Sequence, residues 1–238
     1  MDEFYNIHIL NKKIFIPRKD LIIVVDKIWL LRHGLRLDLE EPDWERENLS
    51  DHDTPLSRKG RIQAEETADY FLKEKENIQY VFSSPFYRTL ETADIIAGKM
   101  DLEVKVEYGF CEFLNPDWFD EFPELLSLEN AVDRFSTIDI DYRTMVKPEY
   151  PEKNENIDTY QRVGQTVDKI INKFRGTILI IGHGASVWQT GRYLVQKNSD
   201  AIQVNMCVPN KLIRDGETWK FKKTVSDHLS YTEEDLEK

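Results

Sequence analysis

Short apolar runs recur along the chain, and the clearest ones end at a polar or glycine-containing segment. Short apolar runs bounded by turn residues are typical of buried strands, and an Asp-Gly pair between two such runs is a hairpin signal. The sequence therefore predicts strands over residues 28–31, 78–82, 104–106 and 177–181, and two more that flank Asp215-Gly216.

Between these runs, apolar residues recur at the spacing of one helix face. A serine before such a segment favours an N-cap, and a proline favours the first helical turn. Four helices are predicted: residues 57–75 with Ser57 as N-cap, 86–100 with Pro85 at or near the first turn, 157–174, and 185–196.

The alternation of strands and helices predicts an α/β fold, with a mostly parallel central sheet covered by helices on both faces, a three-layer α/β/α arrangement. We find no repeat or flexible linker, so residues 1–238 are expected to form one domain. Residues 37–55 are expected to be a long loop, residues 114–156 short helices and loops, and residues 232–238 a frayed tail.

Several chemically capable residues fall at the ends of the predicted strands. They are Arg32, His33, Ser83, Ser84 and His183. In parallel sheets, ligands bind beyond the carboxyl ends of the strands. This shared position predicts a ligand site there.

Composition narrows the classes of ligand. Hydrophobic residues make up 40% of the chain and charged residues 32%, which is typical of a soluble globular protein. The formal net charge of −12 disfavours nucleic acid and anionic membrane as partners. It would also repel a phosphorylated substrate, unless cationic residues gather in a local pocket.

No apolar segment reaches the ~20 residues that cross a bilayer. The acidic N-terminal residues Asp2 and Glu3 do not resemble a secretory signal. Two cysteines are too few for a disulfide framework and suit a reducing compartment. A cytoplasmic location is therefore expected.

Arg32-His33-Gly34-Leu35-Arg36 places a histidine between two arginines after a predicted strand. Neutral imidazole is a nucleophile that can accept a phosphoryl group, and guanidinium groups bind phosphate oxygens. Gly34 would let the backbone approach the anion. The alternative is a surface Arg-His cluster without chemistry.

His183 follows another predicted strand and could donate to the phosphoryl group from the opposite side, although a turn histidine satisfied by backbone is the simpler alternative. Arg88 lies near the start of a predicted helix, where partial positive charge favours anions. For Arg88 the alternative is a surface arginine paired with Glu91.

Cleavage of a phosphate ester also needs an acid that protonates the leaving oxygen. Glu107, Glu112, Asp117 and Asp120 all lie near the end of the third predicted strand, and spacing alone does not choose among them. We see no His, Cys or Asp cluster with metal-ligand spacing, so neither a metal nor another cofactor is expected.

Together these segments resemble the histidine phosphatase superfamily, which has the phosphoglycerate mutase-like fold. The resemblance covers about residues 27–194 in family order. Its segments are Leu31-Arg32-His33-Gly34; residues 54–60 with Gln63-Ala64; Ser83-Ser84-Pro85 with Arg88 and Glu91-Thr92-Ala93; and Gly182-His183-Gly184.

Within that superfamily, Arg-His-Gly-x-Arg-x-Asp at residues 32–38 resembles the branch of the suppressors of T-cell receptor signalling and the ecdysteroid-phosphate phosphatases. Residues 106–113 are similar to the acid-bearing segment of that branch, which selects Glu112. Two features depart from it. The ubiquitin-binding and SH3 modules usual in that branch do not fit here, and Gly184 stands where alanine is frequent.

The resemblance implies that His33 is the nucleophile and Glu112 the general acid. It also implies a phosphate pocket made by Arg32, Arg36, Arg88 and His183. Relatives in this branch are often dimers, so a homodimer is possible.

The leading hypothesis is a metal-independent phosphomonoesterase that forms a phosphohistidine. One alternative is a phosphoglycerate mutase-type phosphoryl transferase, against which Arg36 argues. Another is a non-catalytic phosphate-binding module. The substrate could be a small molecule or a phosphotyrosine protein. Trp44, Trp118, Phe119 and Phe122 could form an apolar wall for an aryl or steroid phosphate, or could be ordinary core.

Overall fold

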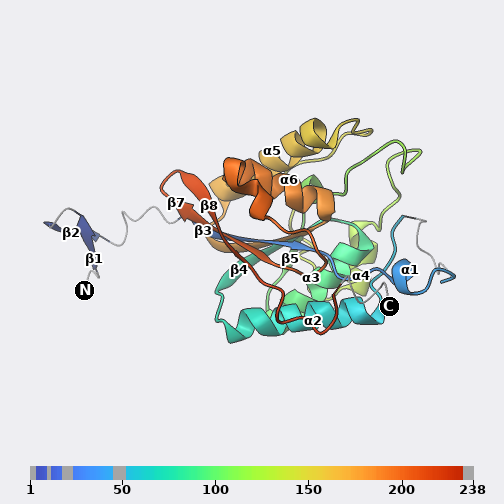
Figure 1. The fold of residues 1–238 in the computed structure, drawn as a ribbon, viewed down its shortest axis with the longest axis horizontal. Helices are drawn as coiled ribbons and strands as arrows, with labels where there is room; N and C mark the ends of the chain where they lie inside the picture. The colour runs from blue at the N-terminus through green and yellow to red at the C-terminus, as the bar shows by residue number, and fades with distance from the viewer. Residues whose placement is uncertain (1–3, 10–11, 18–23, 45–51, 233–238) are drawn as a thin grey trace.

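The computed structural model describes residues 4–9, 12–17, 24–44 and 52–232. A six-stranded sheet with the strand order β5-β4-β6-β3-β7-β8 lies at its centre (Figure 1). Its strands are β3 (Val25–Arg32), β4 (Ile78–Ser83), β5 (Val104–Val106), β6 (Gly176–Gly182), β7 (Asn210–Asp215) and β8 (Thr218–Thr224). β5, β4, β6 and β3 run parallel to one another. β7 pairs antiparallel with β3, and β8 pairs antiparallel with β7. The predicted mostly parallel sheet is confirmed.

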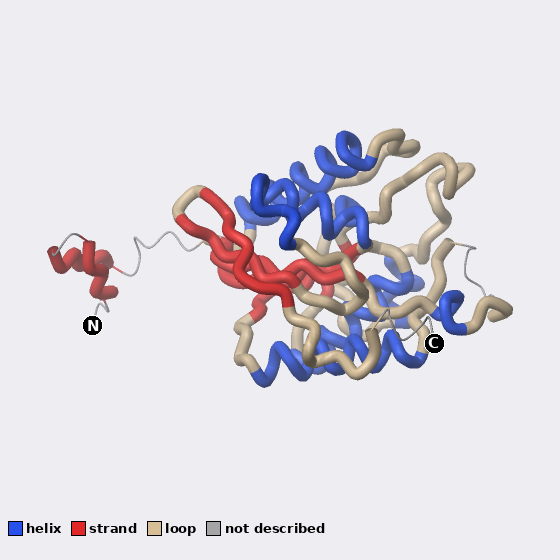
Figure 2. Tube along the Cα trace, in the orientation of Figure 1, coloured by secondary structure: helices blue, strands red, loops and turns tan. Residues whose placement is uncertain are grey.

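Helices cover both faces of this sheet (Figures 1 and 2). On one side lie α2 (Arg58–Lys73), α3 (Tyr87–Met100) and α4 (Leu128–Arg134); on the other lie α5 (Tyr160–Lys173) and α6 (Gly184–Val195). Ser57 caps α2 by accepting a hydrogen bond from the Gly60 N–H, as predicted. The three-layer α/β/α architecture is therefore confirmed.

The central strands are apolar on both faces because both faces are covered. In β3, Trp29 and Leu31 pack in the core on the side of α2 and α3, and Ile28 and Leu30 pack in the core on the side of α5 and α6. This double burial explains why the strands appear in the sequence as continuous apolar runs.

The structure adds elements that the sequence pattern did not predict. The expected loop over residues 37–55 begins with a short helix, α1 (Leu37–Glu40), and its residues 45–51 lie outside the described residues. Strands β1 (Phe4–Ile9) and β2 (Lys12–Pro17) pair antiparallel near the N-terminus. A π-helical turn, η3 (Glu155–Thr159), precedes α5, and the 3-10 turns are η2 (Tyr108–Phe110) and η4 (Gln196–Ala201).

Of the tail expected to fray, residues 233–238 lie outside the described part of the chain. No helix among the described residues is both long and apolar enough to cross a membrane.

The loop after β3 is packed directly against the start of α2. A Cβ atom on Gly34 would lie 2.5 Å from the Gly60 carbonyl oxygen, and one on Gly60 would lie 2.1 Å from the Leu35 carbonyl oxygen. The Leu35 N–H also donates to Gln63 Oε1 at 2.9 Å, and the Gly34 N–H donates to Thr92 Oγ1 at 3.1 Å. Packing against Gly60 therefore requires a residue without a side chain at position 34. This requirement is separate from the approach of an anion that the sequence suggests for Gly34.

We expect Gly60→Ala to lower the free energy of unfolding by about 1–3 kcal/mol, because the new methyl overlaps backbone that cannot yield without displacing the loop. Urea unfolding measures this change. Gly98→Ala is the matched control. Gly98 lies in α3, and a Cβ atom added there would lie 3.7 Å from its nearest neighbour, Thr137 Cγ2. That variant should be stabilised by about 0.5–1 kcal/mol. Equal changes in both variants would contradict the packing argument.

Candidate active site

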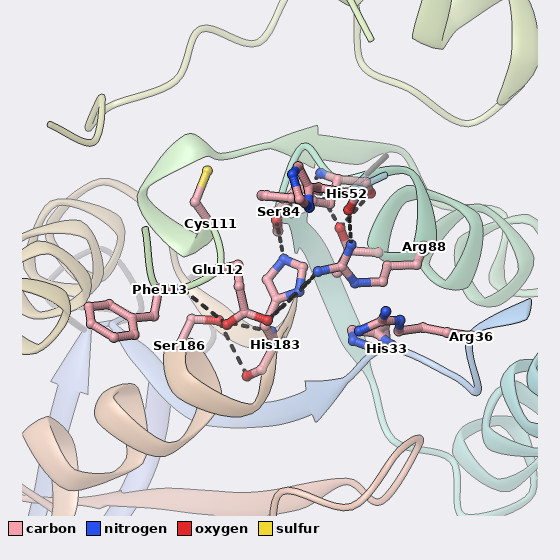
Figure 3. Close-up of polar contacts among 12 residues, drawn as sticks. His33, Arg36, His52, Ser84, Arg88, Cys111, Glu112, Phe113, His183 and Ser186 are labelled. Carbon is pink, nitrogen blue, oxygen red and sulfur yellow. Dashed lines mark hydrogen bonds and ion pairs between the residues drawn. The ribbon is translucent and has the colours of Figure 1, made fainter. Parts of the chain in front are cut away.

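The strand ends that the sequence singled out meet at one edge of the sheet. Register pairs Arg32 of β3 with Gly182 of β6, and Ser83 of β4 with Ile181 of β6. Main-chain hydrogen bonds continue this pairing beyond the strands. The His33 N–H donates to the Gly182 carbonyl at 3.0 Å, and the Ser84 N–H donates to the Ile181 carbonyl at 3.0 Å. Parallel pairing thus brings both histidines to one place (Figure 3).

The imidazole of His33 is buried and held in one tautomer. Its Nδ1 lies 2.7 Å from the Gly34 carbonyl oxygen. Because a carbonyl can only accept, Nδ1 carries the proton and Nε2 carries the lone pair. Burial and then the charges of Arg88 and Arg32 hold the pKa of His33 well below its usual value. The ring is therefore neutral near pH 7, which is the state that a nucleophile requires.

His183 is also buried and neutral, and its ring centroid lies 5.4 Å from that of His33. Its Nδ1 lies 3.1 Å from Arg88 Nη2, and its Nε2 lies 2.8 Å from Ser84 Oγ. Since guanidinium only donates, Nδ1 accepts and the Nε2–H donates to the Ser84 hydroxyl. Burial and the charge of Arg88 lower the pKa of His183 well below its usual value. Both ring nitrogens thus contact side chains, unlike the turn histidine considered as the alternative.

Arg88 projects from the first turn of α3 into the same place. Its Nη1 donates to the His52 carbonyl at 3.1 Å, and its Nη2 lies 3.7 Å from Glu112 Oε2. Its Nε is buried and has no hydrogen-bond partner among the described residues. Burial lowers the pKa of Arg88 to about 10, which leaves the guanidinium charged at neutral pH. Arg88 thus brings a buried positive charge beside both histidines.

The alternative partner considered for Arg88 is engaged elsewhere. Glu91 accepts from Arg61 Nε at 2.6 Å and from the Leu56 N–H at 2.7 Å. The helix start itself also differs from the expectation of an open anion site. Asp53 is buried there and accepts the Tyr87 N–H at 2.5 Å. Burial raises the pKa of Asp53 to about 6. This N–H is therefore already bound within the chain, and the positive charges beside the histidines are those of arginine side chains.

Of the four candidate acids, Glu112 is the one that the structure brings to the histidines. Its Oε1 accepts the Phe113 N–H at 3.0 Å, and its Oε2 lies 3.5 Å from His183 Nδ1. Because His183 is neutral, this contact is not an ion pair. Asp117 and Asp120 are exposed.

Glu107, the remaining candidate acid, is buried and serves a different network. Its carboxylate accepts hydrogen bonds from five donors, which tie the chain just after β5 to residues 142–146. These donors are the Tyr142 and Thr144 hydroxyls at 2.6 Å each, the Met145 N–H at 2.8 Å, and the Gly109 and Val146 N–H groups at 3.1 Å each. Glu107 is therefore fully engaged in holding backbone.

Arg32 and Arg36 complete the cationic surroundings of His33, and the charge of each lowers the His33 pKa. Arg32 Nη1 donates to the Val204 carbonyl at 3.0 Å. Arg36 is paired with Asp38 through two nitrogen–oxygen contacts, of which Nε–Oδ1 is 3.0 Å, and its side chain is 35% exposed. Figure 3 shows Arg36 beside His33.

Sequence reasoning placed Ser84 at the predicted site without assigning it a partner, and it gave no role to Asp38 or Asp53. Ser84 was visible as part of Ser83-Ser84-Pro85, and Asp38 as the acid two residues after Arg36. The approach of Asp53 to α3 is a long-range contact, for which the sequence offers no local signal. Among the described residues, no group of three or more His, Cys, Asp or Glu side chains could hold a metal ion.

Comparison with solved structures agrees with this architecture. The crystal structure of the ecdysone phosphate phosphatase from Bombyx mori, in complex with tungstate, superposes with a TM-score of 0.68 at 21% sequence identity. The superposition covers 87% of this chain and 94% of that one. At this identity the likeness shows the shared fold.

Two curated proteins share local sequence with this chain. The transcription factor tau 55 kDa subunit of Saccharomyces cerevisiae is 38% identical over 97 residues, which is 40% of this chain. The human ubiquitin-associated and SH3 domain-containing protein A is 30% identical over 145 residues, or 58% of this chain. Each match spans only 22% of the length of the relative.

The family comparison covers most of the sequence. Residues 28–227 match the model of the histidine phosphatase superfamily (branch 1), a range that includes both histidines, the three arginines and Glu112. The chain therefore belongs to the histidine phosphatase superfamily.

Proposed function

We propose that this chain is a metal-independent phosphomonoesterase in which His33 takes the phosphoryl group from substrate and releases it to water. The observation that carries the proposal is the state of the His33 ring. It is buried and neutral, its Nδ1–H is bound to the Gly34 carbonyl, and its Nε2 lone pair lies among arginines. Membership of the superfamily supports the same chemistry.

In the first step, Nε2 of His33 attacks phosphorus, and the bond to the leaving oxygen breaks with its electron pair on that oxygen. Phosphoryl transfer depends mainly on positioning and on charge stabilisation. The guanidinium groups of Arg32, Arg36 and Arg88 supply that charge. These cations do the work that metal ions do in other phosphoryl-transfer sites.

Glu112 delivers the proton to the leaving oxygen from Oε2, the carboxylate oxygen that faces Arg88 and His183. In the second step, the resulting carboxylate removes a proton from water as the water attacks phosphorus. The N–P bond breaks and its electron pair returns to Nε2 of His33. One carboxyl group thus acts as acid and then as base.

We further propose an aryl phosphate as substrate, such as phosphotyrosine or a steroid phosphate. Trp118 is 54% exposed and packs edge-on against Phe113, the residue that follows Glu112, with ring centroids 5.7 Å apart. A leaving group protonated by Glu112 would lie near this pair. Phe119, by contrast, is buried with Phe86 and Cys111 and belongs to the core. The Bombyx mori protein with the same fold is an ecdysone phosphate phosphatase, and its steroid phosphate substrate supports this proposal.

A cytoplasmic location suits both cysteines, which are buried free thiols. The possible homodimer stays a prediction, which size-exclusion chromatography with light scattering would test.

Replacing His33 by alanine should abolish turnover. We expect hydrolysis of p-nitrophenyl phosphate in the presence of EDTA by the wild type, and a loss of at least about 1,000-fold in His33→Ala with an unchanged circular dichroism spectrum. His228→Ala is the control, since His228 bonds Thr67 on α2 and should keep full activity. Absence of turnover by folded wild type over about pH 5–8 would overturn the proposal. Activity that depends on a bisphosphorylated primer would indicate a mutase instead.

The two buried rings should resist protonation. Because their pKa values are lowered, neither ring takes up a proton as pH falls from 8 through the ordinary histidine value of about 6.5. Nitrogen NMR of ¹⁵N-histidine-labelled protein measures this directly. It should show the Nδ1–H tautomer for His33 and the Nε2–H tautomer for His183, with assignment by His33→Ala and His183→Ala. A His33 signal that titrates near 6.5 would refute the neutral buried nucleophile.

A further inference from the structure

Glu112 lies on a stretch of chain without regular secondary structure, after η2 ends at Phe110. Backbone outside helices and sheets needs other hydrogen-bond partners when it is buried. Here several of those partners come from one buried ion pair, Arg162 of α5 and Glu152, neither of which enters the chemistry proposed above.

Arg162 binds the carbonyl groups on the N-terminal side of the acid and that of the acid itself. Its Nη1 donates to the Gly109 carbonyl at 2.9 Å and to the Cys111 carbonyl at 3.0 Å, and its Nη2 donates to the Glu112 carbonyl at 3.1 Å. One side chain thus fixes three carbonyl groups within four consecutive residues. The planar guanidinium group can do this because it holds several N–H donors in a rigid fork, which a lysine ammonium group lacks.

Glu152 holds Arg162 and also reaches the C-terminal side of the acid. Its two oxygens accept from Arg162 Nε at 2.7 Å and Nη2 at 2.9 Å, a bidentate pair. Its Oε2 also accepts the Leu114 N–H at 3.0 Å and the Thr159 hydroxyl at 2.9 Å, and its own N–H donates to the Leu114 carbonyl at 3.0 Å. The backbone is therefore bound on both sides of Glu112.

The pair is deeply buried, with Arg162 only 7% exposed and Glu152 only 4% exposed. Burying two charges carries a large desolvation cost, which the short contacts and backbone hydrogen bonds offset. What the arrangement gains is a fixed acid. With the backbone held and Oε1 bound to the Phe113 N–H, Oε2 is the oxygen left to face His183 and Arg88.

We infer that Arg162, anchored by Glu152, is the positioning residue for the general acid Glu112, and that it controls proton delivery to the leaving group. This inference rests on the proposed function. It predicts a selective defect, because a proton matters most when the leaving oxygen is strongly basic. Phenolate is such a group, since phenol-type hydroxyls have a pKa of about 10. Dinitrophenolate leaves readily without a proton.

The test compares kcat/KM for phenyl phosphate and 2,4-dinitrophenyl phosphate, because kcat/KM reports transfer to His33 and not the later hydrolysis. Glu112→Gln sets the reference pattern. We expect Arg162→Lys to lose about 100-fold on phenyl phosphate and less than about threefold on dinitrophenyl phosphate, as expected for the loss of general acid catalysis. Thr159→Val removes only the hydroxyl that donates to Glu152. It should change the ratio of kcat/KM on the two substrates in the same direction, but by a smaller factor. This milder variant keeps the test valid if Arg162→Lys folds poorly.

Arg175→Lys is the matched control. Arg175 follows α5 and also binds carbonyl groups, those of Asn172 and Phe174, but it is exposed. The ratio of kcat/KM on the two substrates in Arg175→Lys should therefore equal that of the wild type. Equal losses on both substrates in folded Arg162→Lys would show a purely structural role and overturn the inference, as would no loss on either. Failure of the proposed function is separate: wild type would then hydrolyse neither substrate, or His33→Ala would remain active.

Discussion

Parallel pairing of β4, β6 and β3 is the constraint on which the site depends. Because all three strands point the same way and are in register at their ends, the residues that follow them meet above one edge of the sheet. His33 and His183 are far apart in sequence but have ring centroids 5.4 Å apart. Both faces of these strands pack in a core, so a slip in register would misplace closely packed side chains on both sides of the sheet.

Burial then sets the chemistry of these side chains. Histidine on a surface would be partly protonated near neutral pH, whereas here desolvation and neighbouring guanidinium groups keep both rings neutral. The same arginines that would bind a phosphate therefore also prepare the proposed nucleophile. This local concentration of cations lies in a chain whose net charge is −12, so long-range electrostatics contribute little to attracting an anion, and recognition depends on short-range contacts.

Local patterns in the sequence were enough for the central strands, the long helices and the identity of the residues at the strand ends. The Ser57 cap and the Asp215-Gly216 hairpin were predictable because their signals lie within a few residues. The π-turn before α5, the use of Asp53 at the start of α3, and the engagement of Glu107 were not, because each depends on contacts between distant segments. Choosing Glu112 among four acids likewise required a resemblance, since only the tertiary fold separates a carboxylate facing the histidines from one that binds backbone.

The residue before Glu112 has a consequence of a different kind. Cys111 is completely buried, and burial raises its pKa to about 12; the same holds for Cys207, the only other cysteine of the chain. Peroxide attacks thiolates that are exposed, and neither condition is met at these two sites. The proposed phosphoryl-transfer site, built on imidazole beside such a shielded thiol, would therefore resist oxidants that inactivate enzymes with a cysteine nucleophile.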